Sequence, residues 1–327
     1  MTSPDRHAVR KAVVPTPLAG PFELHVPTYD GSGQTVEPDI VFFPGGWNGW
    51  EYWMAINPYP RGDASVEHPS IVVSHDGLDW VVPPGAVNPV VPRDGANSDP
   101  DLSYDPVGDR LVLHYRQVRE GANVILSTSS RQGSLWSVPR VAFRETNHGA
   151  VGPSTVHQAG GRTAMWYLDA GPQGCRSGAT TLKLRTSPSA IDLAVSPAAA
   201  LWSAPVTTDL RQPGQVLWET DVEYVASTRE YWAIYPAFPD AAGSCGRDDL
   251  FFARSGDGLT WSVHAVPFLR RGFSAWADGT LYKATFVYDA DHDLLRVWFS
   301  AMARDGTWHL GFVSYRFSAF EQALAGA

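Results

Sequence analysis

Residues 74–80 read SHDGLDW, and residues 255–261 read SGDGLTW. Both match the pattern Ser-x-Asp-Gly-x-x-Trp, and a decayed copy, SRQGSLW, ends at Trp136. An Asp-Gly pair favours a tight turn between two strands, and the Trp that follows can pack back over that turn. A pattern of this length that recurs at full strength indicates an internal repeat, and a repeat decides the class of fold.

The same order of strands and turns recurs upstream of these copies. Five acidic or polar starts lead into strands rich in β-branched and aromatic residues: EPDIVFF at 37–43, DPDLSYD at 99–105, GPSTVHQ at 152–158, ETDVEYV at 219–225 and LYKATFVYD at 281–289. A unit of three or four antiparallel strands cannot bury both of its faces alone, whereas a ring of stacked units can. We therefore predict an all-β protein, a five-bladed β-propeller. A stack of β-sandwiches is the alternative, but it does not explain five regular starts.

The predicted ring is a single domain over residues 1–327, with blades starting near 37, 99, 152, 219 and 281. The last unit runs out of chain after HLGFVSYRF, and the segment FELHVPTYD at 22–30 precedes the first unit. We expect this N-terminal strand to complete the fifth blade and close the ring. Residues 1–20 are expected to be extended or disordered, and residues 318–327 to form a short C-terminal tail that could be helical.

Composition restricts the partners. The net charge is −9 and no basic stripe is present, which argues against nucleic acid and against an anionic membrane surface. A carbohydrate suits this surface better. No apolar run reaches the roughly 18 residues of a transmembrane helix, and the N-terminus lacks the apolar segment of a secretory signal. We therefore expect a cytoplasmic protein, or one that is associated with a virion or released by lysis.

The two cysteines, Cys175 and Cys245, have no Cys or His neighbour at metal-ligand spacing. Free buried thiols are the usual state in a cytoplasmic chain. The two residues nevertheless fall in equivalent loops of neighbouring predicted blades, which favours a disulfide as the alternative.

Three of the five starts carry a pair of carboxylates: Glu37 and Asp39, Asp99 and Asp101, and Glu219 and Asp221. The first strand of each blade lines the axis of a propeller, so these starts should converge on one axial depression. Residues two apart in an extended strand point the same way, so all six carboxylates should share the depression. Crowded carboxylates raise one another's pKa, which is how a general acid is made at neutral pH.

Other polar and aromatic residues should surround this depression. The third and fifth starts carry Ser154 and Lys283, and the lysine would hold a carboxylate ionised or contact a substrate hydroxyl. Sugar recognition needs rings that stack on the sugar and charged groups that hydrogen-bond its hydroxyls. The candidates in the loops and neighbouring strands are Tyr59, His68, Arg116, His148, Tyr167 and Arg304. Together with Glu37 and Asp99, these residues are the predicted substrate-binding set.

Five blades with carboxylates at the inner strands resemble the glycoside hydrolases of family 43 and related furanosidase families. The resemblance implies hydrolysis by two carboxylates, with Asp39 as the base and Asp101 tuning pKa and orienting substrate. The third blade departs from the pattern because GPSTV has no Glu, and the nearest acid upstream is Glu145. The acid is therefore assigned to Glu219, with Asp221 as a second modulator. The expected substrate is a furanoside such as an arabinan or galactan, cut by two carboxyls about 5–5.5 Å apart in retaining enzymes or roughly 6.5–9.5 Å apart in inverting ones.

Other functions fit the same fold. The acidic depression can also hold a Ca²⁺ ion, which takes six to eight oxygen ligands. The chain would then be a lectin-like module or part of a phage tail, with affinity for a glycan but no turnover. A different propeller enzyme, such as a lyase or sugar transferase, is the third hypothesis. The glycosidase hypothesis requires no cofactor.

Overall fold

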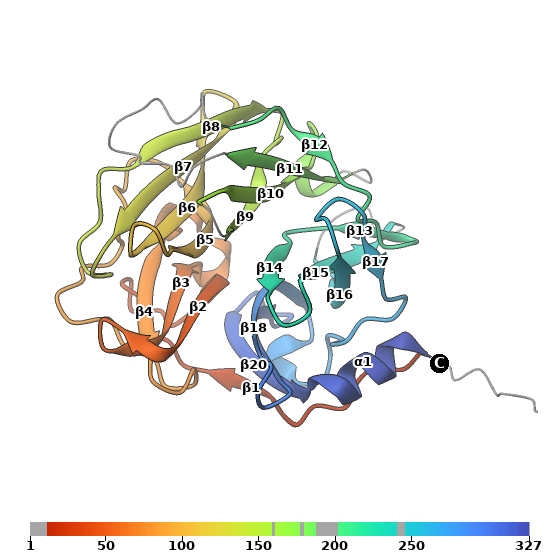
Figure 1. Ribbon diagram of the computed structural model, residues 1–327. Helices are drawn as coiled ribbons and strands as arrows, with labels where there is room; N and C mark the ends of the chain where they lie inside the picture. The colour runs from red at the N-terminus through yellow and green to blue at the C-terminus, as the bar shows by residue number, and fades with distance from the viewer. Residues whose placement is uncertain (1–11, 159–160, 177–179, 188–201, 241–245, 327) are drawn as a thin grey trace, which may run out of the picture.

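The computed structural model describes residues 12–158, 161–176, 180–187, 202–240 and 246–326. Antiparallel sheets are arranged as blades around a common axis (Figure 1), which confirms the predicted five-bladed β-propeller. Among the described residues no helix is long and apolar enough to cross a membrane.

Each blade is one consecutive stretch of chain, apart from the strand that closes the ring. The first blade contains β2 (Thr35–Trp47), β3 (Trp50–Pro58) and β4 (Ser70–Ser74). The second contains β5 (Asn97–Asp105), β6 (Arg110–Arg119), β7 (Ala122–Ser130) and β8 (Arg140–Thr146). The third contains β9 (Val151–His157), β10 (Thr163–Asp169), β11 (Thr181–Ser187) and β12 (Val206–Thr207).

The fourth blade contains β13 (Gln215–Leu217), β14 (Asp221–Val225), β15 (Glu230–Pro239), β16 (Asp249–Ser255) and β17 (Ser262–Val263). Its inner edge is interrupted, because β13 and β14 both pair with β15. The fifth blade contains β18 (Thr280–Asp289), β19 (Leu294–Met302) and β20 (Trp308–Arg316). Strand β1 (Ala19–Leu24) pairs with β20, as predicted for ring closure.

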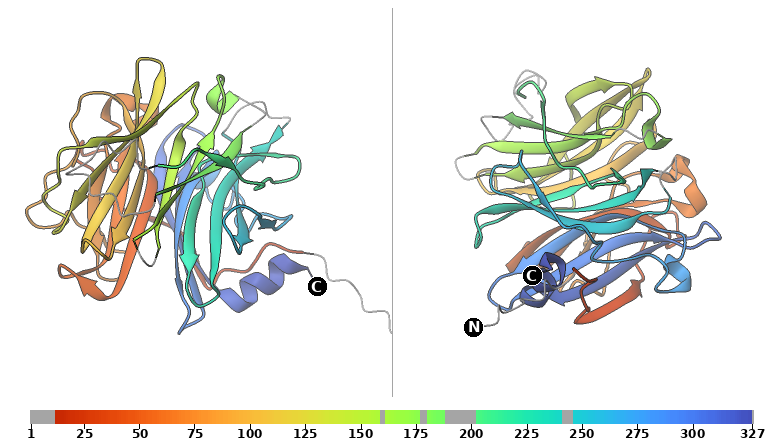
Figure 2. Two further views of the ribbon diagram at one scale, coloured as in Figure 1. Left: turned by 45° about the horizontal axis from the view of Figure 1, so that its top comes forward. Right: turned by 90° about the vertical axis from the view of Figure 1, so that its right-hand side faces the viewer.

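Short helices complete the structure. One-turn 3₁₀ helices occupy Pro60–Gly62, Ala64–Val66, Gly174–Arg176 and Ala275–Ala277. The helix α1 (Phe317–Ala325) follows β20 directly and lies outside the ring (Figure 2). Its buried residues Phe317, Phe320 and Leu324 cover the outer part of the core between the fourth and fifth blades. The N-terminal segment runs beside it, where the Val13 amide donates to the Ala323 carbonyl.

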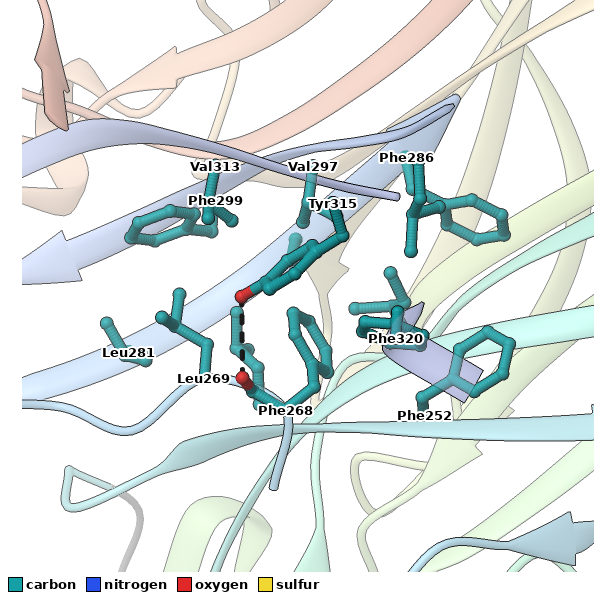
Figure 3. Packing of buried hydrophobic residues seen from close by; sticks show 14 of the residues in the cluster. Phe252, Phe268, Leu269, Leu281, Phe286, Val297, Phe299, Val313, Tyr315 and Phe320 are labelled. Carbon is teal, nitrogen blue, oxygen red and sulfur yellow. Dashed lines mark hydrogen bonds between the residues drawn. The ribbon is translucent and has the colours of Figure 1, made fainter. Parts of the chain in front are cut away.

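The core of the described chain divides into five clusters, and each cluster lies between two neighbouring blades. Figure 3 shows the cluster between the fourth and fifth blades, where Phe252 and Phe268 pack against Phe320, and Phe268 also packs against Tyr315. The alternating apolar residues of each strand supply these faces, because side chains in a strand point to opposite sides in turn. The ring therefore has no single central core, and its axis is left to polar side chains.

The repeated Asp-Gly turns join neighbouring blades. In both copies the aspartate accepts hydrogen bonds from the two amides that follow the glycine, as Asp76 does from Leu78 and Asp79. The Gly77 carbonyl accepts a 2.7 Å hydrogen bond from the indole of Trp298, which belongs to the fifth blade. Trp166 of the third blade donates to Gly258 in the same way. A β-carbon on Gly77 would lie 2.7 Å from the Trp298 ring, so the motif requires glycine for close packing as well as for the turn.

Candidate active site

The starts of the first three blades are bulges and not regular strand. Glu37, Asp99 and Gly152 have φ angles of 59°, 54° and 54°, in the left-handed region. The pairing register skips these residues in β2, β5 and β9, and each is followed by a proline, which cannot donate to the ladder. The bulge separates Glu37 from Asp39 and Asp99 from Asp101, and in the fourth blade Glu219 lies in the break between β13 and β14, just before Asp221. The expectation that both members of a pair point into one depression is therefore wrong.

One member of each pair forms what we call the outer ring, Glu37, Asp99 and Glu219. One carboxylate oxygen from each of the three lies within 4.8 Å of the others. All three residues are buried, with at most 3% of their surface exposed, and they lie at the floor of a cavity of about 490 Å³. The cavity opens at the end of the axis where the inner strands begin. The outer ring is thus the part of the acidic centre that a ligand can reach.

Protein donors hold the outer ring in place. Glu37 Oε2 accepts hydrogen bonds from the Asp99 amide at 2.8 Å and from Asn57 Nδ2 at 2.9 Å. Asp99 Oδ2 accepts from the Gly152 amide at 2.8 Å and lies 2.9 Å from Arg116 Nε. These contacts run from blade to blade around the axis. They fix the carboxylates before any ligand arrives.

The third blade contributes no acid to the outer ring, and the reason is steric. A β-carbon on Gly152 would lie 2.9 Å from Cγ of Glu219 and 3.2 Å from its Cβ. Glycine at this bulge therefore leaves the space that the Glu219 side chain occupies. Glu219 Oε1 accepts a 2.7 Å hydrogen bond from the Tyr282 hydroxyl, which in turn accepts one from Trp218 Nε1. Its other oxygen, Oε2, is buried and has no hydrogen-bond partner among the described residues.

Burial and electrostatic repulsion raise the pKa values of the two glutamates of the outer ring. Burial and the nearby Asp99 carboxylate raise the pKa of Glu37 to about 7. Burial, together with Glu37 and Asp99, raises the pKa of Glu219 well above its usual value. A third carboxyl in the cavity wall, Glu67, has a raised pKa for the same reasons, burial first and then Glu37 and Asp99. Such groups can exchange protons near neutral pH.

The other members of the pairs form an inner ring, Asp39, Asp101 and Asp221, which does not line the cavity. At its centre is Lys283, which is fully buried, lies 3.3 Å from Asp39 and donates to the Pro100 carbonyl. Burial alone disfavours the ammonium, but Asp39 and Asp101 outweigh burial and raise the pKa of Lys283. Within the described part of the chain, one oxygen of each aspartate, Oδ2, has no hydrogen-bond partner. Lys283 therefore holds the inner carboxylates, and its position excludes contact with a substrate in the cavity.

The structure brings six of the predicted site residues to the cavity: Glu37, Tyr59, Asp99, Arg116, His148 and Glu219. It does not bring the predicted base Asp39 there, nor the predicted modulators Asp101 and Asp221. Ser154 is also too deep, because its hydroxyl donates to the Val222 carbonyl and the Asp221 carboxylate. Ser154 therefore lies beside Asp221 of the inner ring and not in the cavity.

Three further candidates lie away from the cavity. His68 is buried against Tyr29, and its Nδ1 is 3.1 Å from Asn97 Nδ2. Tyr167 is buried between the second and third blades, where Glu145 accepts a hydrogen bond from its hydroxyl. Arg304 is exposed and pairs with Asp278 at 3.2 Å. Their contacts are those of structural and surface residues.

Several cavity residues were not singled out from the sequence: Glu67, Trp218, Tyr282 and Trp308. Two of them directly precede predicted site residues: Trp218 precedes Glu219, and Tyr282 precedes Lys283. The aromatic rings form one wall, with ring centres 5.6 Å apart for Tyr282 and Trp308 and 6.0 Å apart for Tyr59 and Trp308. Cys175 also lines the cavity and is not a free thiol. Cys245, the other half of the expected disulfide, lies outside the described residues.

Comparisons with known proteins agree with this fold. No family model matches the chain. The chain is 28% identical, over 324 residues and 83% of its length, to an A type blood N-acetyl-alpha-D-galactosamine deacetylase of Flavonifractor plautii. The chain spans 40% of the length of that relative.

Among solved structures, an N-acetylgalactosamine deacetylase of F. plautii in complex with blood group B trisaccharide superposes with a TM-score of 0.83 and 23% identity, covering 93% of this chain and 97% of that one. A GH62 α-L-arabinofuranosidase of Coprinopsis cinerea gives a TM-score of 0.61 and 13% identity, with coverages of 90% and 95%. An α-L-arabinanase of Penicillium chrysogenum complexed with arabinobiose gives a TM-score of 0.59 and 12% identity, covering 94% of this chain and 99% of that one. The predicted resemblance to propeller furanosidases is confirmed for the fold, and the chain is similar to carbohydrate-active enzymes.

Proposed function

We propose that the chain is a carbohydrate-active hydrolase that removes the acetyl group from an N-acetylated amino sugar. The observation that carries this proposal is the outer ring, in which three carboxylates meet within 4.8 Å at the floor of the cavity. The 28% identical relative, whose name describes an N-acetyl-galactosamine deacetylase, supports the choice of reaction.

The outer ring fits a divalent cation. Ligand oxygens around one ion are at most about twice a metal–oxygen bond of 2.3–2.6 Å apart, which the spacing of Glu37, Asp99 and Glu219 satisfies. Glu219 Oε2 is buried without a hydrogen-bond partner, as expected of an atom that has a ligand to bind. Three carboxylates are a hard oxygen set that suits Mg²⁺, Mn²⁺ or Ca²⁺. When bound, such an ion polarises a carbonyl and makes water a better nucleophile.

The remaining cavity residues have roles in binding and proton transfer. The sugar ring would lie against the aromatic wall of Tyr59, Tyr282 and Trp308, with its acetamido group directed to the outer ring. Glu67 would take a proton from the attacking water and return it to the nitrogen as the carbon–nitrogen bond breaks. Acetate and a free amine leave. Trp218 and Tyr282 keep Glu219 in position through their hydrogen bonds.

The position of the acids supports this reaction over glycosidic cleavage by the predicted pair. Glycosidases use two carboxyls, about 5–5.5 Å apart in retaining enzymes and roughly 6.5–9.5 Å apart in inverting ones, that both act on the bound sugar. Asp39, the predicted base, does not line the cavity. The outer ring instead gathers three carboxylates, with one oxygen of each within 4.8 Å of the others, and this arrangement suits a shared cation.

The first experiment measures two products from the same incubation. The protein is mixed with glycans that end in N-acetylgalactosamine or N-acetylglucosamine and with arabinan, and released acetate and new reducing ends are assayed separately. Acetate without reducing ends is expected, and reducing ends without acetate would overturn the proposal. The Glu219→Gln variant should lose the activity, whereas Glu120→Gln, which alters an exposed acid paired with Arg144, should keep it.

A metal titration tests the outer ring without relying on turnover. After chelation, added Mn²⁺ or Ca²⁺ should raise the melting temperature of the native protein, because an ion that binds only the folded state stabilises it. Asp99→Asn should remove that increase. An equal increase in both proteins would place the ion elsewhere.

Hydrolysis of a furanoside is the second candidate, and the cavity residue Glu37 favours it through its pKa of about 7, which suits a general acid. In that reaction Glu37 or Glu219 would be the acid, with a partner from the cavity in place of Asp39. Binding of a glycan without any turnover would instead support the lectin-like hypothesis.

A further inference from the structure

A second cavity, of about 500 Å³, lies at the opposite end of the axis. All five innermost strands contribute to it through the parts of their sequence that follow the two acidic rings. Its lining includes Phe42 of β2, Tyr104 of β5, His157 of β9, Glu223 of β14 and Tyr288 of β18. No residue of this cavity lines the first one. The proposed function leaves it unused.

The half-buried Glu223 is the acidic group of this cavity. In the described part of the chain its carboxyl has no hydrogen bond and no ion pair. The carboxylates on its other side are those of the inner ring, and burial followed by Asp221, Asp39 and Asp101 raises the pKa of Glu223. A cation beside Glu223 would relieve this repulsion and hold the carboxylate ionised.

The other groups around Glu223 do not supply that cation. None of the described lining residues is Lys or Arg. The nearby arginines do not line the cavity: Arg110 pairs with Asp105 at 3.0 Å, and Arg296 lies 3.7 Å from Asp289 and 5.9 Å from the centre of the Phe42 ring. Lys283 is shared among the inner carboxylates.

His157 is also uncharged at neutral pH. Burial lowers the pKa of His157 to about 4, with His114 adding to the effect. Its ring nitrogens are 3.1 Å from the hydroxyls of Ser103 and Thr163. The cavity therefore presents one unpaired acid without a resident positive charge.

The walls of the cavity are aromatic. Phe42, Tyr104, Tyr224 and Tyr288 line it, and Tyr224 has 44% of its surface exposed. Aromatic faces attract cations, and a carboxylate beside them completes the usual site for an organic ammonium ion. An anionic ligand would be repelled by Glu223 and by the acids behind it. A neutral ligand would donate a hydrogen bond to Glu223 at most, and would not offset the repulsion between Glu223 and the acids behind it.

We propose that this second cavity binds an organic ammonium group, such as the protonated amine of an amino sugar, with Glu223 as its carboxylate partner and the aromatic rings as its walls. The inference does not depend on the proposed deacetylation. The two are nevertheless compatible, since removal of an N-acetyl group leaves a sugar with a protonated amine.

The test is a calorimetric titration of the Asp99→Asn variant, which keeps the first cavity from turning over ligand, with galactosamine and galactose at pH 7. Galactosamine should bind with higher affinity than galactose. In the same background, Glu223→Gln should weaken galactosamine binding about ten- to a hundredfold, the effect of a lost hydrogen bond to a charged group. Tyr224→Leu should weaken it less, and Glu120→Gln should leave it unchanged.

Three results would overturn the inference. They are equal affinity for galactose and galactosamine, galactosamine binding that Glu223→Gln leaves unchanged, and no galactosamine binding at all. A thermal melt of Glu223→Gln shows whether the variant is folded, and the Tyr224→Leu titration provides an independent reading of the same cavity. Acetate release by the chain with Asp99 intact is measured separately, so a failed deacetylation and a failed ammonium site are distinguished.

Discussion

The two acidic rings have the same origin in the repeat but different surroundings. Glu37 and Asp99 of the outer ring are bulge residues that face the cavity, whereas Asp39 and Asp101 follow in regular strand and face the buried lysine. Among the described residues the outer ring has Arg116 at its side, paired with Asp99, whereas Lys283 lies among the carboxylates of the inner ring. We infer that the outer ring is built to bind and the inner ring to hold the blades together.

The largest expected effect comes from changing one ring at a time. Asp99→Asn should lower kcat/KM for acetate release by about 10²- to 10³-fold, because it removes a charge from the reacting centre. Stability should change little, since the variant also relieves repulsion with Glu37 and Glu219. Asp101→Asn should do the reverse. It disturbs the bond from the Thr155 amide and the contact with His114, and should cost about 1–3 kcal/mol in the free energy of unfolding.

Kinetics and chemical denaturation of both variants check this pair. Equal loss of activity in the two, with equal stability, would remove the distinction between the rings.

Removing the buried lysine should damage stability most. Lys283→Met leaves three buried carboxylates without their cation, which should cost about 3–5 kcal/mol. Lys183 provides the control, because it pairs with Asp169 near the surface, and Lys183→Met should cost less than about 1 kcal/mol. Urea unfolding measures both. Similar stabilities of the two variants would contradict the role given to the inner ring.

Filling the space at Gly152, beside Glu219 of the outer ring, should have an intermediate effect on activity. Gly152→Ala places a β-carbon 2.9 Å from Glu219 Cγ and should displace that side chain, lowering kcat/KM about tenfold or more. The matched control is Gly214→Ala, where φ is also positive, +69°, but nothing lies within 4 Å of the added carbon. It carries only the backbone strain, about 1 kcal/mol. Equal activity of Gly152→Ala and Gly214→Ala would show that space beside Glu219 is unimportant.

The last prediction concerns the pH dependence of stability, where the change within any one pH unit is small. Burial, with Asp101 adding to it, raises the pKa of Asp221 to about 7, although Lys283 acts against this. The unfolded chain releases this proton near pH 4, so the folded state holds more protons in between. The contribution of Asp221 to stability therefore falls as the pH rises from about 4 to about 7, by at most about 1.4 kcal/mol per pH unit. Asp221→Asn should flatten melting temperature against pH in this window, and an unchanged slope would contradict the assignment.

A proline in each of the first two starts was a sequence signal for the separation of the outer-ring from the inner-ring carboxylates. Pro38 and Pro100 stand between the two acids of their pairs, and a proline within a strand indicates a bulge or an edge. The prediction treated these starts as regular strand, so it placed Asp39 and Asp101 in the cavity. Glu67 and the aromatic wall had no comparable signal. They come from loops or from blades far apart in the chain, and only ring closure brings them together.

The sequence by itself determined the number of blades, the closure of the ring by its N-terminal strand, and the concentration of carboxylates on the axis. These follow from local patterns that repeat, namely alternating apolar residues, Asp-Gly turns and acidic starts. The tertiary structure alone decided which carboxylates a ligand can reach. That choice depends on contacts between blades: the space at Gly152 that Glu219 fills, the Asp99 carboxylate held by Arg116, and the Lys283 ammonium that withdraws Asp39 from the cavity. Such contacts join residues distant in sequence, and their geometry exists only once the ring has closed.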